Sequence, residues 1–170
     1  MLLERSYFSS PATHLAIDLL GKILCRRTEN GVTRARITET ECYFGEEDTA
    51  CHAHKGKTER TKTMYEEGGI TYVYLCYGMH AMLNIVTGRR DHPEAVLIRG
   101  IEGANGPGRT TKLLQITTKD NASPLAPESG IWIEDDGLKF DYTALPRVGI
   151  DYASEEDRNR PWRYIIKERE

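Results

Sequence analysis

Two glutamates placed two residues apart are the first candidates for chemistry in this sequence. Strict alternation over residues 32–43 puts Ile37, Glu39, Glu41 and Tyr43 on one face of a strand, and that face is the less polar one. A carboxylate turned toward an apolar interior has its charged form disfavoured, so its pKa rises and it becomes a candidate general base or acid. The alternatives are a surface-facing strand end or a structural ion pair with Arg99.

The spacing of this pair fits one class of reaction. Residues i and i+2 of a strand lie about 6.6 Å apart along the chain. That distance overlaps the separation of roughly 6.5–9.5 Å between the two carboxyl groups of inverting glycosidases. Hydrolysis of a glycosidic bond is therefore a candidate reaction for Glu39 and Glu41.

Tyrosines supply a second functional signal. Tyr43, Tyr72, Tyr74 and Tyr77 are candidates for a stacking pocket, because an aromatic face holds a flat base by about 1–3 kcal/mol. The alternative for any one of them is packing in the core of a sheet.

A zinc site is a further hypothesis, raised by Cys42, Cys51, His52 and His54. Their spacing fits no common structural zinc pattern, and on a helix over 49–55 the two histidines point to different sides. We therefore expect no metal and interpret His52 as a pocket or core group. The four cysteines form no CxxC pair, so reduced thiols are expected.

The segment Gly106–Arg109 is a candidate anion site, because it leads into a helix whose first N–H groups are free. The sequence contains no Walker A, GxGxxG, GxSxG or HExxH motif. Nucleotide triphosphate, dinucleotide, serine hydrolase and zincin mechanisms are therefore without support.

Short helices and strands must position these groups. Ser10 and Pro11 are typical of a helix start, and Gly21 is typical of its end. Asp48 can cap a short helix that Gly56 closes. The other predicted elements are strands at 22–27, 32–43, 71–77, 79–86, 95–101 and 162–166, a hairpin turn at Asn30-Gly31, and a helix at 111–116. The predicted fold is α+β: one domain over 1–170, with a curved, mainly antiparallel sheet and flanking helices.

Composition and charge limit the protein class. With 170 residues, 29% of them charged, and a mean hydropathy of -0.55, the chain is expected to be one soluble globular domain. Glu4 and Arg5 interrupt any signal peptide, so an intracellular protein is expected. Residues 120–157 carry ten acidic and two basic residues, whereas the rest of the chain is net basic. Either the molecule has one basic and one acidic face, or these charges are ordinary solvated surface.

The motifs taken together closely resemble the alkyladenine (3-methyladenine) DNA glycosylase family of the mammalian type. The matching segments are TETECYFG at 38–45, Glu47-Asp48, His52, YVY at 72–74, YGM at 77–79, Asn84, VLIRGIE at 96–102, GPGR at 106–109, RVG at 147–149 and PWRY at 161–164. They follow the family's order and cover essentially the whole chain.

This resemblance implies hydrolysis of the N-glycosidic bond of a damaged purine that is flipped out of duplex DNA. Glu41 matches the family's general base and Arg99 matches the residue that positions it and the attacking water, whereas Glu39 is not the family's base, so the paired-carboxylate hypothesis holds only in part. Water is the nucleophile, so a monofunctional enzyme without strand-nicking activity is expected, and no metal or cofactor is implied. Typical family substrates are 3-methyladenine, 7-methylguanine, hypoxanthine and ethenoadenine.

The resemblance also assigns binding roles. Tyr43, His52 and Tyr74 match the residues that sandwich the flipped base, and Asn84 matches the residue that rejects the exocyclic amine of guanine. Tyr77, on a β-hairpin, matches the wedge inserted in the minor groove, and Met64 occupies a neighbouring wedge position. The expected contacts to the DNA backbone are Lys55, Lys57, Arg60, Gly106 and Arg109.

Some positions depart from the family pattern. His80 stands where some members have an aromatic wedge residue, and Cys42 replaces a small apolar residue and should face away from the pocket. The connection from Gly103 to Gly106 is shorter than in the larger members. The sequence therefore resembles a compact, bacterial-type member, expected to act as a monomer on duplex DNA in the cytoplasm, near the nucleoid in a bacterium.

Two other function classes remain open at this point. One is a damage-binding module that recognises distorted DNA without turnover, and the presence of Glu41 argues against it. The other is a carbohydrate glycosidase that uses Glu39 and Glu41, with Tyr72 and Tyr74 as sugar platforms.

Overall fold

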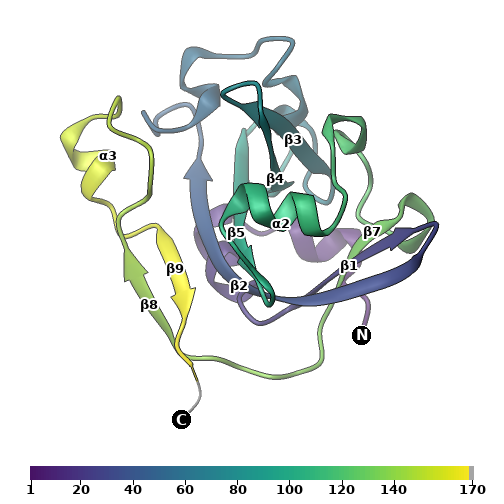
Figure 1. Ribbon diagram of the computed structural model, residues 1–170. Coiled ribbons are helices and arrows are strands. Elements are labelled where there is room, and N and C mark those ends of the chain that lie inside the picture. Colours follow the sequence, from purple (N-terminus) through teal and green to yellow (C-terminus); the bar gives the residue numbers. More distant parts are fainter. Residues whose placement is uncertain (169–170) are drawn as a thin grey trace.

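The computed structural model describes residues 1–168. Over these residues nine strands form one antiparallel sheet, which confirms the predicted α+β fold (Figure 1). The main path of the sheet is β3 (Thr71–Cys76), β4 (His80–Val86), β5 (Glu94–Ile101), β2 (Gly31–Phe44), β1 (Ile23–Thr28) and β7 (Ile131–Glu134). Three short strands complete the sheet. β6 (Ala104–Asn105) pairs with the end of β5, and β8 (Tyr142–Leu145) pairs with β9 (Arg163–Ile166), which also pairs with β2.

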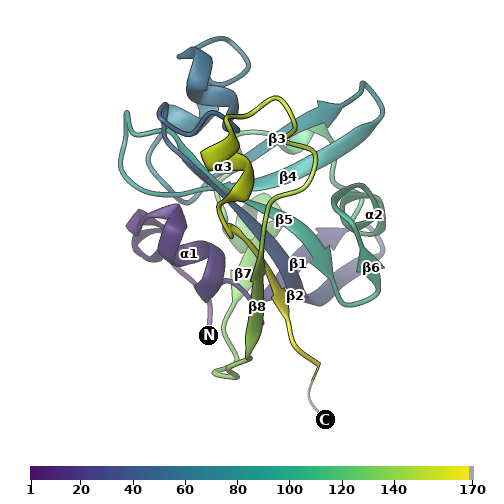
Figure 2. The ribbon, with the colours of Figure 1, turned by 90° about the vertical axis from the view of Figure 1, so that its left-hand side faces the viewer.

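Helices cover both faces of the sheet. Two views at right angles show α1 (Ala12–Asp18) and α2 (Pro107–Leu113) on opposite sides of β2 and β5 (Figure 2). The third helix, α3 (Glu155–Asn159), lies beside the β8–β9 hairpin. Single 3₁₀ turns occupy Arg5–Ser9, His52–Lys55, Lys62–Tyr65, Thr118–Asp120 and Pro127–Ser129.

The first helix buries the apolar stripe that the sequence predicts. Its inward residues, with those of the turn after it, are Ala12, Leu15, Ala16, Leu19 and Leu20. The predicted cap is wrong, however: Pro11 occupies the N-cap position, and Ser10 makes no capping bond. Instead the Ala12 N–H donates to Glu94 Oε1 at 2.6 Å. The helix start packs against β5, so a buried carboxylate from a distant strand replaces the local cap.

Strand β2 is the longest element and changes partners along its length. Its first half pairs with β1, and its second half lies between β5 and β9. The register against β5 shifts between Ile37 and Thr40, which is a β-bulge. Ile37 and Cys42, which strict alternation puts on opposite faces, consequently both lie in the main hydrophobic core. The prediction that Ile37 and Glu41 share one face is therefore wrong.

The β3–β4 hairpin matches its prediction closely. Its strands turn at Tyr77 and Gly78, whose φ angles of 52° and 67° are both left-handed. Two consecutive positive φ angles give the tight turn that suits the twist of a hairpin. The Tyr77 side chain stands at the tip with 93% of its surface exposed.

Three local predictions need correction. The β1–β2 turn consists of Glu29 and Asn30, because Gly31 already pairs with Thr28. Asp48 caps no helix, and the predicted helix there is a single 3₁₀ turn from His52 to Lys55. Helix α2 begins at Pro107, earlier than predicted, since proline is favoured in the first turn of a helix.

Tertiary pairing also explains the charge asymmetry. Acidic residues of 120–157 pair with basic residues of β1, β2 and the residue before β1: Asp120 with Arg26, Glu134 with Arg34, Asp135 with Lys22, and Asp136 with Arg36. These four acidic residues therefore neutralise the positive charge of this hairpin. Within the part of the chain described, no helix is long and apolar enough to span a membrane.

Candidate active site

A cavity of about 580 Å³ opens between the β3–β4 hairpin, the last third of β2 and the segment before α3. Aromatic residues dominate its wall: Tyr43, His52, Tyr72, Tyr74, Tyr77 and Tyr152. Asn84, Arg99 and Val148 add polar groups, the last through its backbone. The cavity therefore brings together segments of the chain that lie more than one hundred residues apart.

Glu41 lies at the inner side of this cavity and is completely buried. Its Oε2 accepts the Val148 N–H at 2.7 Å, and its Oε1 accepts the Tyr43 hydroxyl at 2.9 Å. Arg99 Nη1 lies 3.5 Å from the same Oε1. Burial raises the pKa of Glu41, while the charge of Arg99 and the two hydrogen bonds oppose that rise. The net direction is upward, so Glu41 is more basic than an exposed glutamate.

Sheet pairing fixes where Glu41 stands relative to the pocket. In one row across the sheet, Tyr72 pairs with Asn84, Asn84 with Leu97, and Leu97 with Glu41. Paired residues of antiparallel strands point to the same face. Asn84 and Glu41 are two strands apart, which is about 10 Å. The row therefore places the Glu41 carboxylate and the Asn84 amide on the same face of the sheet, with β5 between them.

Glu39 does not form a free carboxylate pair with Glu41. Its Oε1 accepts a bond from Arg163 Nη1 at 3.0 Å and lies 3.7 Å from Arg99 Nε. The structural ion pair with Arg99, one of the alternatives considered from the sequence, is present for both glutamates. Since Glu39 is engaged by two arginines, the arrangement does not favour a two-carboxylate carbohydrate glycosidase.

A buried ion pair that the sequence did not predict supports the site from behind. Arg147 donates to both carboxylate oxygens of Asp48, at 2.6 and 2.9 Å, and neither side chain is exposed. The Arg147 guanidinium also lies 5.1 Å from the ring centre of Tyr43. Its neighbour in the chain is Val148, whose N–H holds Glu41. The motifs Glu47-Asp48 and Arg147-Val148-Gly149 were visible in the sequence, but only the structure joins them.

The aromatic wall is built from two segments. His52 comes from the 3₁₀ turn and Tyr74 from β3, and their ring centres are 4.5 Å apart. His52 Nδ1 lies 3.2 Å from the Tyr72 hydroxyl. Burial, and to a lesser degree the charge of Arg60, lowers the pKa of His52 to about 4. This wall therefore presents a neutral imidazole at neutral pH.

Asn84 is buried in β4 and lines the cavity. Its amide nitrogen donates to the backbone oxygen of Tyr72 at 3.2 Å, which fixes the orientation of the side chain.

His54 does not line the cavity with His52; its Nδ1 lies 2.6 Å from the Glu46 carbonyl oxygen. The two histidines of the zinc hypothesis thus point in different directions, and all four cysteines are free thiols.

Two methionines near the cavity differ from the sequence prediction. Met64, predicted as a second wedge, is only 2% exposed and packs with Tyr65 and Tyr72 in a hydrophobic cluster. Met64 also lines the cavity, and its role as a wedge stays a prediction. Met79, at the hairpin tip with Tyr77, is 75% exposed and was not among the predicted site residues. Its place next to the turn at Gly78 was the available signal.

The predicted DNA backbone residues surround the cavity but are not equivalent. Lys55, Lys57 and Arg109 are exposed, and within residues 1–168 none of them forms an ion pair. Arg60 is exposed as well, but its side chain also lines the cavity, with its guanidinium carbon 4.9 Å from the ring centre of Tyr74. Gly106 forms the N-cap of α2 with a positive φ of 101°. The predicted anion loop is thus the start of the helix that carries Arg109.

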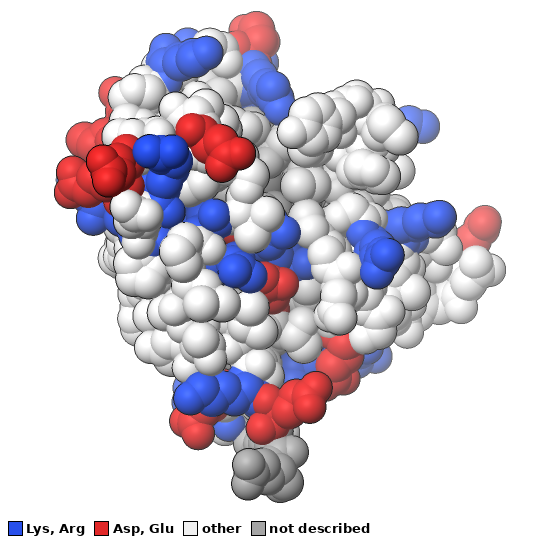
Figure 3. Space-filling model, turned by 60° about the vertical axis from the view of Figure 1, so that its left-hand side comes forward, with Lys and Arg blue, Asp and Glu red and all other residues white. Residues whose placement is uncertain are grey.

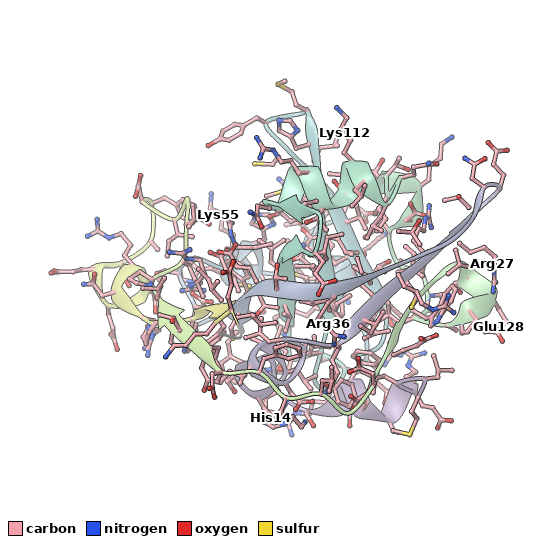
Figure 4. The ribbon with its side chains drawn as sticks, turned by 60° about the horizontal axis from the view of Figure 1, so that its bottom comes forward. His14, Arg27, Arg36, Lys55, Lys112 and Glu128 are labelled. Carbon is pink, nitrogen blue, oxygen red and sulfur yellow. The ribbon has the colours of Figure 1, made fainter. Side chains whose placement is uncertain are left out.

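Charged side chains are unevenly spread over the surface. Figure 3 shows Lys and Arg in a band across the middle of one face, with acidic groups above it and at its lower edge. In the view of Figure 4, Lys55 and Lys112 lie in the upper half and His14 in the lower half. Lys112, on α2 beside Arg109, was not among the predicted cationic contacts.

Fold and site together define an α+β protein with a buried, ionisable carboxylate beside an aromatic-walled cavity. The profile of the methylpurine-DNA glycosylase (MPG) family matches residues 6–104 and 102–170. The chain therefore belongs to this family, as the sequence motifs indicated.

Individual relatives align with this chain over most of their lengths. A protein of Psychrobacter cryohalolentis, described as "Putative 3-methyladenine DNA glycosylase", is 43% identical over 184 residues, covering 91% of this chain and 87% of its own. Proteins with the same description from Borrelia garinii subsp. bavariensis and Methanocella arvoryzae are 41% and 40% identical. Each of these two alignments covers 98% of this chain, and they cover 96% and 92% of the respective relatives.

Proposed function

We propose that the protein is a monofunctional DNA glycosylase that hydrolyses the N-glycosidic bond of alkylated or deaminated purines in duplex DNA. The substrate class includes 3-methyladenine, hypoxanthine and ethenoadenine. One observation carries the proposal: a fully buried Glu41, held by Arg99, Tyr43 and the Val148 N–H, lies beside an aromatic-walled cavity. The family membership and the printed names of the relatives agree with it.

The reaction requires the damaged nucleotide to leave the base stack, because no side chain can reach the sugar–base bond inside a duplex. The flipped base would enter the cavity and stack against Tyr43, His52 and Tyr74. Tyr77, exposed at the hairpin tip, would fill the gap from the minor groove. Lys55, Lys57 and Arg109 would hold the DNA backbone, and one copy of the chain would be sufficient.

Glu41 would act as general base. It takes a proton from a water molecule, the water oxygen bonds to the sugar carbon, and the electrons of the C–N bond leave with the base. Arg99 would orient that water, because it lines the cavity and its Nη1 lies 3.5 Å from Glu41 Oε1. Among the described residues that line the cavity there is no lysine to form a Schiff base. This supports a water nucleophile and a product that is an intact abasic strand.

The test is single-turnover incubation with a duplex that carries one hypoxanthine or ethenoadenine, followed by alkali to reveal abasic sites. Glu41→Gln keeps the size of the side chain and should retain lesion binding while base release is lost. Glu39→Gln is the matched control, and it should slow release far less because Glu39 touches only arginines. Equal rates for wild type and Glu41→Gln would contradict the role of Glu41. Lesion-dependent binding by the wild type without any base release would support a damage-binding module instead.

A further inference from the structure

Arg60 occupies a position that backbone binding does not explain. Its guanidinium carbon lies 4.9 Å from the ring centre of Tyr74, within the range of a cation–π contact. The side chain lines the same cavity as His52 and Tyr72. A cation whose role was limited to phosphate contact would have no reason to cover an aromatic wall of the base pocket.

The charge of Arg60 has no acidic partner. No carboxylate of residues 1–168 lies within ion-pair distance of it, and the adjacent Glu59 pairs with Lys62 at 2.8 Å. A guanidinium remains charged at any pH at which the protein is folded. The cavity wall therefore contains a permanent and unneutralised positive charge.

The other charged groups around the cavity offset one another. Arg99 lies 3.7 Å from Glu39 and 3.5 Å from Glu41, and Arg163 also pairs with Glu39 at 3.0 Å, so two cations balance the two glutamates. Asp48 and Arg147 form a neutral buried pair. With these charges balanced, Arg60 decides the sign of the potential that a base in the cavity experiences.

The charge of Arg60 affects the pKa values of three residues of the cavity wall, His52, Tyr72 and Tyr74. Burial lowers the pKa of His52, and Arg60 lowers it further. Burial raises the pKa of Tyr72 to about 12 and also raises that of Tyr74, and Arg60 opposes both changes. The potential of Arg60 thus extends across the space between these rings.

We propose that Arg60 is a specificity-determining residue, which weakens the binding of purines with a positive ring charge and speeds the release of neutral purines. The inference rests on the proposed glycosylase function. It concerns which lesion is preferred and not whether the reaction takes place.

The two lesion classes differ in charge before and after bond cleavage. A 7-methylguanine in DNA has a positively charged ring and leaves as a neutral base. Hypoxanthine is neutral and takes the electrons of the C–N bond, so negative charge develops on it until it is protonated. A fixed cation beside the ring repels the first in the bound state and stabilises the second in the transition state.

An aromatic pocket alone would favour the opposite order. Tyrosine faces attract cations, so an empty wall of Tyr72 and Tyr74 would hold a cationic purine well. In this protein Arg60 already takes a cation–π position on Tyr74. The cationic base therefore loses part of that attraction and also meets the repulsion of the guanidinium.

The experiment compares Arg60→Gln with wild type in single-turnover reactions on duplexes that contain one 7-methylguanine or one hypoxanthine. The maximal rate and the half-saturating enzyme concentration are measured for each lesion. Removing the charge should lower the maximal rate for hypoxanthine about tenfold and lower the half-saturating concentration for 7-methylguanine by about threefold to tenfold. The maximal rate for 7-methylguanine should not fall. Arg60→Lys should keep the wild-type order of lesions, because it keeps the charge.

Lys57→Gln is the matched control. It also removes one cation near the cavity, but the Lys57 side chain does not line it. Because phosphate contacts are the same for every lesion, this variant should weaken binding of both duplexes by one common factor. Thermal unfolding of each variant verifies that the fold is intact.

The outcomes separate this inference from the proposed function. If wild type releases neither base, the glycosylase function itself is refuted. If wild type releases both, and Arg60→Gln changes the two lesions by one common factor as Lys57→Gln does, the role of Arg60 alone is overturned. A selective change in the stated direction supports it.

Discussion

Replacing Asp48 by alanine tests how far the site depends on its buried ion pair. The Arg147 guanidinium is fully buried and donates two bonds to Asp48, at 2.6 and 2.9 Å. Without that carboxylate its charge keeps only backbone acceptors, the carbonyl oxygens of Cys42 at 2.9 Å and Asp157 at 3.3 Å. Removing one partner of a buried ion pair destabilises a protein by about 3–5 kcal/mol.

The expected loss of stability in Asp48→Ala is larger because Asp48 makes further contacts. Its carboxylate also accepts the N–H groups of Phe44 at 3.0 Å and Ala50 at 3.1 Å, and the variant leaves both donors unpaired. We therefore expect the upper part of that range. For a chain of this size each kcal/mol corresponds to about 2–4 °C, so Asp48→Ala should lower Tm by about 10 °C or more.

The assay is thermal unfolding followed by circular dichroism, with urea unfolding to obtain the free energy. Asp151→Ala is the control, because this exposed acid lies in the same region and forms no ion pair within the described residues; it should change stability by less than about 0.5 kcal/mol. The double variant Asp48→Leu/Arg147→Met removes both charges together and should recover much of the loss. A loss below about 1 kcal/mol in Asp48→Ala would refute the claim that the pair stabilises the site.

Three further predictions concern the carboxylate, the wedge and the cationic rim. Burial raises the pKa of Glu41, so the folded protein binds a proton there more tightly than the unfolded chain does. The free energy of unfolding should therefore fall as pH rises from the ordinary pKa of 4.5 through the raised one. Denaturant titrations at several pH values should show this slope in wild type, and a slope that persists in Glu41→Gln would contradict it. Tyr77→Ala should leave Tm within about 2 °C, because the side chain is exposed, while base release from duplex falls strongly in gel assays; equal rates would remove Tyr77 from the wedge role. Lys57→Gln should reduce the slope of log affinity against log salt by about one in binding titrations, and an unchanged slope would exclude Lys57 from phosphate contact.

Local patterns in the sequence were sufficient for most of the elements. The apolar spacing over 12–20 predicts the first helix, and the aromatic and β-branched runs around Gly78 predict the β3–β4 hairpin. These signals succeed because helix and strand periods depend on neighbouring residues only. Local patterns failed where a residue distant in the sequence makes the contact. At the start of α1, for example, the Ala12 N–H donates to Glu94 and not to Ser10.

The candidate site shows the same division. Glu41 and Tyr43 are neighbours on one strand face, so alternation already suggested that they act together. The bulge between Ile37 and Thr40 was not visible in the sequence, because a single extra residue changes the strand face without changing composition. The contact of Arg60 with Tyr74 was not visible either, since charge counting cannot tell whether an exposed cation also lines a cavity.

The sequence by itself determined the α+β class, the hairpin with its exposed tip, and the motifs that indicate the methylpurine-DNA glycosylase family. Only the tertiary structure decided which groups surround Glu41: Arg99 from β5 and the Val148 N–H from the segment before α3. The physical reason is that the pKa of a carboxylate depends on burial and on charges within a few ångströms. Those neighbours lie 58 and 107 residues away in the chain, and only packing brings them to the same place.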